Sequence, residues 1–230
     1  MKKFLLTGCI LLGCLPGLLA QQKKDKDWAA FSRYAEANQT VGTRPRAVLM
    51  GDSITDSWAA QDPQWLQEHG LVGRGISGQT TSQMLVRFRA DVIDLNPRYV
   101  VILAGINDIA RNNGIMDVSH IFGNIVSMVE LAKVHKIKPV LCAVLPASEI
   151  GWRKDLGDPT PRILELNALL KDYARRNHIP FVDYYTPMAT PDGSLNPDWA
   201  RDAVHPNLEG YHKMEEILFS TLPSLEVVKK

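Results

Sequence analysis

Five short apolar runs recur along the chain and alternate with segments whose apolar residues are spaced three and four apart. The runs have the length of buried strands, and their β-branched residues favour extended backbone. The spaced segments are typical of amphipathic helices. The pattern predicts strands at residues 46–51, 70–75, 99–105, 138–146 and 179–185, and helices at residues 82–95, 118–136, 161–177 and 206–222.

The predicted strands are largely apolar, with a poorer run at residues 70–75, so both faces of the strands are expected to be buried. Continuous apolar strands separated by helices are typical of a parallel sheet covered by helices on both faces. We therefore predict one three-layer α/β/α domain. A further helix is expected at residues 25–39, with Trp28 and Phe31 packing on the body of the domain.

The first twenty residues have a different pattern. Lys2 and Lys3 precede an apolar run at residues 4–19, which ends at Ala20 before the polar stretch QQKKDKD. This is the layout of a secretory signal peptide, and the run is too short for a comfortable membrane span. Cleavage after Ala20 is the preferred interpretation; it leaves residues 21–230 as a single exported domain in a bacterial periplasm. The alternative is a lipoprotein signal, LLGC, with a lipid anchor on Cys14.

Composition, charge and cysteine content limit the classes of function that the sequence supports. The 230 residues, 45% hydrophobic and 22% charged, describe an ordinary globular chain. Loss of the leader changes the formal net charge from +1 to about −1, so no basic surface for nucleic acid is predicted. Cys142 is the only cysteine beyond the leader and has no basic neighbour in sequence, which favours a buried structural thiol over a nucleophile.

Polar residues follow directly after the first three strands. Asp52 and Ser53 follow the first, Ser77 and Gly78 the second, and Gly105, Asn107 and Asp108 the third. The carboxyl ends of parallel strands meet at one edge of a sheet, where ligands bind, so these residues are expected to converge.

Ser53 at a strand-to-helix turn has two possible roles. Serine is a frequent helix N-cap. It is also a nucleophile when a base and an orienting carboxylate lie beside it, and RDAVHPN supplies both groups in Asp202 and His205. Donors for an oxyanion are available from the Ser53 and Gly78 amides and from the Asn107 side chain.

Four blocks of the sequence carry a resemblance. GDSIT at 51–55, GISGQTT at 75–81, GIND at 105–108 and DAVH at 202–205 resemble, in order, the signature blocks of the SGNH hydrolases, also called GDSL esterases and lipases. The resemblance implies a flavodoxin-like domain with a five-stranded parallel sheet. It also implies Ser53 as nucleophile, His205 as general base, Asp202 as its orienting partner, and the Ser53 and Gly78 amides with Asn107 as oxyanion donors.

Other polar and aromatic residues receive structural interpretations. Asp52 and Asp108 are expected to brace turns, and Thr80 and Thr81 to cap a helix. Trp152 and Trp199, in Pro- and Gly-punctuated loops, are the tryptophans best placed to line a pocket. Four further histidines lack partners at metal-ligand spacing and are interpreted as solvated or capping groups: His120, His135, His178 and His212. No metal or other cofactor is predicted.

The sequence thus predicts an exported serine esterase of the acetylhydrolase or acetylesterase type, acting on short acyl esters of small molecules or glycans. Two alternatives stay open. One is a lysophospholipase or thioesterase of the same family, and the other is a non-catalytic glycan-binding protein. The mechanism requires neutral His205, so activity is expected to fall at acid pH. The oligomeric state is left open.

Overall fold

The computed structural model describes residues 27–225. At its centre is a five-stranded, all-parallel sheet in the order β2-β1-β3-β4-β5, which confirms the predicted flavodoxin-like sheet. Residues Ala47–Gly51 pair in register with both neighbouring strands, so β1, β2 and β3 end at the same edge. The strands are β1 (Ala47–Gly51), β2 (Leu71–Gly75), β3 (Tyr99–Leu103), β4 (Lys138–Cys142) and β5 (Phe181–Val182).

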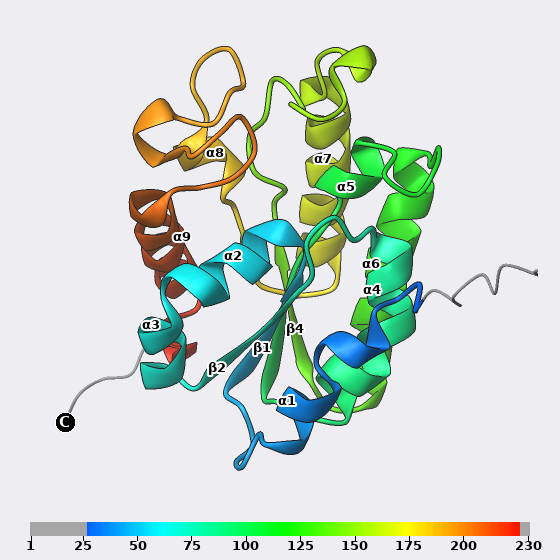
Figure 1. Cartoon of the computed structure of the whole chain (residues 1–230), viewed down its shortest axis with the longest axis vertical. Coiled ribbons are helices and arrows are strands. Elements are labelled where there is room, and N and C mark those ends of the chain that lie inside the picture. The colour runs from blue at the N-terminus through cyan, green and yellow to red at the C-terminus, as the bar shows by residue number, and fades with distance from the viewer. Residues whose placement is uncertain (1–26, 226–230) are drawn as a thin grey trace, which may run out of the picture.

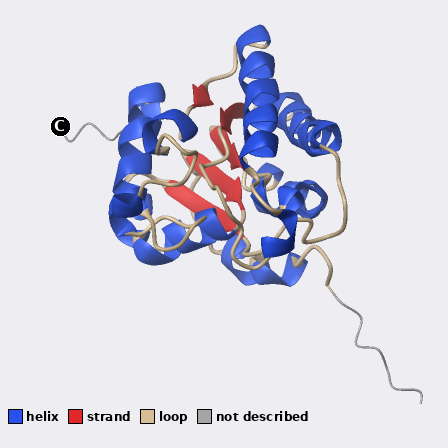
Figure 2. Cartoon of the chain, turned by 90° about the horizontal axis from the view of Figure 1, so that it is seen from above, coloured by secondary structure: helices blue, strands red, loops and turns tan. Residues whose placement is uncertain are grey.

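Helices cover both faces of the sheet, and the predicted three-layer architecture is confirmed (Figure 1 and Figure 2). One layer holds α2 (Ser53–Gln61), α3 (Pro63–Glu68) and α9 (Leu208–Thr221). The other layer holds α4 (Thr81–Phe88), α6 (Val118–Val134) and α7 (Thr160–Arg176). The short helical segments are η1 (Phe31–Arg33), α1 (Ala35–Gln39), α5 (Ile106–Ile109), η3 (Lys154–Leu156), α8 (Tyr185–Met188), η4 (Pro197–Trp199) and η5 (Pro223–Leu225).

The core has two halves, one on each face of the sheet. Along β1, Val48 and Met50 pack into the half that includes α4, α6 and α7. Ala47 and Leu49 pack into the half that includes α2, α3 and α9. All four side chains are buried, which explains why the run is apolar at every position and does not alternate.

Three of the predicted helices correspond closely to α6, α7 and α9. The fourth, expected at residues 82–95, is α4 followed by a π-helical turn, η2 (Arg89–Ile93). The π-helical hydrogen bond runs from the Asp94 N–H to the Arg89 carbonyl. Helices α3, α5 and α8 have four to six residues each, which is too short to give a helical period in the sequence.

The expected helix at residues 25–39 is wrong as a continuous element, because Ala30 adopts a left-handed φ of 55° and only η1 and α1 follow it. Trp28 and Phe31 are 49% and 46% exposed, so their predicted packing on the domain is also wrong. The buried residues of this segment are Ala29 and Tyr34, and the Tyr34 hydroxyl donates a hydrogen bond to the Gly75 carbonyl.

The predicted signal peptide and Cys14 lie outside the described residues. Within residues 27–225, every helix is too short or too polar to cross a bilayer.

Candidate active site

Ser53 is the first residue of α2 and is separated from the end of β1 by Asp52 alone. The Asp52 carboxylate accepts a hydrogen bond from the Ile54 N–H at 3.0 Å and caps the helix. A Cβ on Gly51 would lie 2.1 Å from the Thr55 Oγ1, so only glycine lets the helix begin this close to the strand. The polar turn therefore ends the buried strand abruptly and holds Ser53 at the carboxyl edge of the sheet.

His205 lies beside Ser53, although 152 residues separate them in sequence. The His205 Nε2 is 2.9 Å from the Ser53 Oγ, and the His205 Nδ1 is 2.9 Å from each Asp202 carboxylate oxygen. Because an ionised carboxylate only accepts hydrogen bonds, Nδ1 carries the proton of the neutral ring and Nε2 is left as an acceptor for the hydroxyl. In this tautomer, the imidazole can remove the Ser53 proton.

Asp202 is held by its own loop. Its Oδ1 accepts backbone N–H groups from Val204 at 2.9 Å and from His205 at 2.8 Å. Partial burial raises the pKa of the Asp202 carboxyl, but these hydrogen bonds and that of the imidazole outweigh it, so the pKa lies below its usual value. Asp202 is therefore ionised at neutral pH and stabilises positive charge on His205.

Gly78 and Asn107 lie at the same edge. Asn107 is 1% exposed, and its Nδ2 is a buried donor without a partner among residues 27–225. Gly78 has a φ of 79°, in the left-handed region that glycine tolerates best. The Ser53 N–H belongs to the first residue of α2 and has no acceptor within the helix. All three residues line the same pocket, and among residues 27–225 the Asn107 Nδ2 is left unused as a donor.

Four of the five predicted site residues, all except Asp202, lie around one open pocket. Ser53, Gly78, Asn107 and His205 line this pocket, which has a volume of about 420 Å³. It is at the small end of the range for small-molecule sites. A larger hollow of about 610 Å³ beside α6 is lined by none of these residues.

Residues 49–213 match the family model described as GDSL-like lipase/acylhydrolase. The chain belongs to this family. A crystal structure of a candidate acylhydrolase from Bacteroides fragilis is 47% identical, with a TM-score of 0.84 over 88% of this chain and 100% of that one. An acetylxylan esterase of Geobacillus stearothermophilus is 25% identical over 199 residues, 74% of this chain and 90% of the esterase. The uncharacterised lipoprotein YqeF of Bacillus subtilis is 29% identical over 184 residues, 66% of this chain and 76% of YqeF. The family and these relatives make the protein a carboxylic ester hydrolase.

In this GDSL-family site, the neighbouring acids brace turns as predicted. Asp108 accepts hydrogen bonds from the Thr81 N–H at 2.9 Å and the Thr81 Oγ1 at 2.6 Å, which ties the loop after β3 to the start of α4. Thr80 is the N-cap of α4. Burial raises the pKa of Asp52 to about 7 and that of Asp108 to about 6.

Of the two tryptophans predicted to line a pocket, the structure brings one to the site. Trp152 lines the pocket, with its ring centroid 6.0 Å from that of His205. Trp199 does not line it and packs beside α9, where the Lys213 Nζ lies 5.7 Å from its ring.

Arg87 and Asn112 were not identified from the sequence. Arg87 is fully buried; it pairs with Asp91 at 2.8 Å and donates hydrogen bonds to the Gln79 side chain and to the Gly51 carbonyl, just before the Ser53 turn. The sequence does contain a signal for Arg87: it lies on the apolar face of a predicted helix, and an acidic residue, Asp91, follows four positions later. Asn112 lines the pocket, and its contacts with Gly78 and Trp152 are too distant in sequence to have given one.

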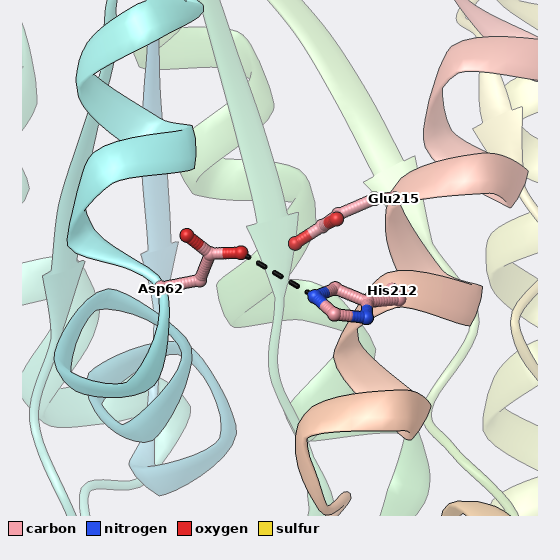
Figure 3. A group of neighbouring side chains, drawn as sticks. All are labelled: Asp62, His212 and Glu215. Atoms are coloured by element: carbon pink, nitrogen blue, oxygen red, sulfur yellow. Dashed lines mark ion pairs between the residues drawn. The ribbon is translucent and has the colours of Figure 1, made fainter.

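The expectation that these four histidines lack partners at metal-ligand spacing is wrong for His212. Its Nε2 lies 3.5 Å from the Asp62 Oδ2, and Glu215 points into the same gap from α9 (Figure 3). One ligand atom from each of the three residues lies within 4.8 Å of the others, a set whose chemistry suits Zn²⁺. However, burial raises the pKa of Glu215 to about 7, and its carboxylate accepts a hydrogen bond from the Trp58 indole, so a proton and an ion pair also satisfy this cluster. None of the three residues lines the Ser53 pocket.

Proposed function

We propose that this protein is an exported serine esterase that hydrolyses short-chain carboxylic esters through Ser53, His205 and Asp202. The observation that carries the proposal is the hydrogen-bonded chain from the Ser53 Oγ through the imidazole to Asp202, with 2.9 Å at each link. Its position in an open pocket of an acylhydrolase-family protein supports the same function.

In the proposed mechanism, His205 removes the Ser53 proton as the hydroxyl oxygen attacks the ester carbonyl. The developing oxyanion accepts hydrogen bonds from the Ser53 and Gly78 amides and from the Asn107 Nδ2. His205 then protonates the leaving alcohol. A water molecule, activated by the same imidazole, attacks the acyl-enzyme and releases the acid and free Ser53.

We propose acetyl groups on carbohydrates as the substrate class. The acetylxylan esterase of Geobacillus stearothermophilus, 25% identical to this chain, supports acetyl transfer to water. The pocket volume of about 420 Å³ suits a short acyl group, and Trp152 offers an aromatic wall of the kind on which a sugar ring packs.

Export is the proposed route to the substrate, with cleavage after Ala20 as the preferred processing. The lipoprotein name of the Bacillus subtilis relative supports testing the alternative, a lipid on Cys14. The mass of the N-terminal peptide of the protein expressed in a bacterium distinguishes the two: an N-terminus at Gln21 supports cleavage after Ala20, and a diacylated Cys14 supports the anchor.

The first test compares hydrolysis of p-nitrophenyl acetate, butyrate and octanoate by the protein and by Ser53→Ala. We expect acetate to be preferred and the variant to lose about 10⁴-fold or more in kcat. The control is Ser127→Ala on α6, whose hydroxyl bonds only its own helix at Gly123 and which we expect to be fully active. Retained activity in Ser53→Ala would contradict the proposed nucleophile, and a preference for octanoate would favour the lysophospholipase or thioesterase alternative.

A further inference from the structure

The Asn112 side chain joins three parts of the pocket wall. Its Oδ1 accepts a hydrogen bond from the Trp152 Nε1 at 3.0 Å. Its Nδ2 donates to the Asn107 Oδ1 at 2.8 Å and to the Gly78 carbonyl at 3.2 Å. Asn112 thus touches two of the three residues whose donors are proposed to face the oxyanion, and also the aromatic wall.

These contacts determine which way each amide points. An indole N–H can only donate and a carbonyl oxygen can only accept, so Trp152 and Gly78 together leave Asn112 one orientation. In this orientation the Asn112 Nδ2 donates a hydrogen bond toward Asn107. The side of the Asn107 amide that faces Asn112 must therefore be its oxygen. The Asn107 Nδ2 is left on the other side of its amide, and it is one of the buried donors without a partner among the described residues.

The turn that carries Asn112 is itself fixed by the loop that carries Trp152. Arg153 donates a hydrogen bond to the Ala110 carbonyl at 2.7 Å, one residue before Arg111 adopts a left-handed φ of 56°. Two neighbouring residues of one loop therefore hold two points of the turn after α5.

We infer that Asn112 is a positioning residue that keeps the Asn107 amide with its N–H groups toward the oxyanion, in an orientation set by the Trp152 indole. The inference rests on the proposed function, because it assigns a cause to the orientation of one of the three proposed donors. Trp152 accordingly has a polar role through Asn112, separate from any packing of its ring against substrate.

The decisive variant is Asn112→Asp, which places an acceptor where the Asn107 oxygen now receives a hydrogen bond. Asn107 is expected to rotate its amide and donate to the new carboxylate, so that an oxygen faces the oxyanion. We expect kcat for p-nitrophenyl acetate to fall about 100-fold or more, the effect of losing one oxyanion donor, with KM changed less than about threefold. Asn112→Ala should lose less, because Asn112 is exposed and water can take its place.

The matched control is Asn113→Asp, which makes the same change of charge one residue away. Asn113 is exposed and donates to the Thr80 hydroxyl, outside the pocket wall. It should keep kcat within about twofold, since surface substitutions of this kind have small effects.

A double-variant cycle with Asn107→Ala separates the inferred role from a general structural one. In the Asn107→Ala background, Asn112→Asp should lower kcat by less than about threefold. If the two losses multiply, or if Asn112→Asp alone loses less than threefold, the inference is overturned while the serine mechanism stands. Turnover retained by Ser53→Ala would overturn both.

If Asn112→Asp fails to fold, Trp152→Phe decides, because it removes the indole N–H and keeps a smaller aromatic ring in the wall. Loss of one hydrogen bond predicts a fall in kcat of about 2- to 10-fold. That fall should disappear in the Asn107→Ala background. A fall that persists there comes from the aromatic wall and contradicts the inference.

Discussion

Replacing Arg87 with methionine should destabilise this protein more than replacing an exposed arginine. The Arg87 side chain is 0% exposed, and that of its partner Asp91 is 2% exposed. The guanidinium also donates to the Gln79 Oε1 at 2.6 Å and to the Gly51 carbonyl at 3.0 Å. Methionine fills much of the same space but leaves these acceptors without their donor.

The magnitude follows from the buried charge. Removing one partner of a buried ion pair costs about 3–5 kcal/mol, because the other charge stays in a medium that solvates it poorly. The lost hydrogen bonds to neutral acceptors overlap with this cost and are not added to it. Against a total stability of about 5–15 kcal/mol, such a loss is large. For a domain of this size, it corresponds to a fall in Tm of about 6–20 °C.

Urea unfolding followed by tryptophan fluorescence and far-UV circular dichroism measures the effect. The control is Arg175→Met on α7, whose side chain is 74% exposed and lies 2.8 Å from Asp172; it should lose less than about 0.5 kcal/mol. Arg87→Met combined with Asp91→Leu should recover part of the loss, since no unpaired charge is then buried. A loss below about 1 kcal/mol in Arg87→Met, or one equal to that of Arg175→Met, would refute the reasoning.

Three further predictions concern titration and the free thiol. The mechanism needs a neutral His205, so kcat/KM should fall at acid pH, and a flat profile from pH 5 to 8 would contradict this role. Because burial raises the folded pKa of Asp52 from 3.8 to about 7, the unfolded chain ionises first and the protein loses stability as pH rises through this window. Urea unfolding should therefore find Asp52→Asn more stable than the parent by about 2–4 kcal/mol at pH 8 and similar to it at pH 4; an equal difference at both would contradict the shift. Burial also raises the pKa of Cys142, so in a chain starting at Gln21 a disulfide reagent should modify this thiol only on unfolding, and fast labelling of the native protein would show an exposed thiol.

The sheet was predictable because the apolar pattern of its strands indicates that they are buried. Most of the runs are apolar at consecutive positions, and this pattern is typical of a strand buried on both faces. Ser53, Gly78 and Asn107 were predictable for a related reason. They follow three strands whose common register brings their ends together, so adjacency in space follows from position after a strand.

The N-terminal segment and the His212 cluster were not predictable in this way. The Asp27 carboxylate accepts hydrogen bonds from the N–H groups of Phe31 and Ser32, and Ala30 in the left-handed region interrupts the helix. The spacing of apolar residues does not indicate either feature. His212 meets Asp62 through the packing of α9 against the junction of α2 and α3. Such a contact depends on how two helices pack against each other. Their relative position follows from the complete fold and has no local pattern in the sequence.

The distribution of satisfied polar groups adds a physical criterion for the site. Buried polar groups are nearly always hydrogen-bonded, so each exception requires a reason. In residues 27–225, the buried side-chain atoms without a partner are the Asn107 Nδ2, the Arg111 Nε and the Tyr184 hydroxyl, and of these residues only Asn107 lines the Ser53 pocket. Near Asn107, the Asp108 carboxylate accepts the Thr81 N–H at the start of α4, and the Arg87 guanidinium donates to the Gly51 carbonyl at the end of β1. These two residues pair the polar groups beside the pocket, whereas the Asn107 Nδ2, which we propose as an oxyanion donor, stays unpaired within it.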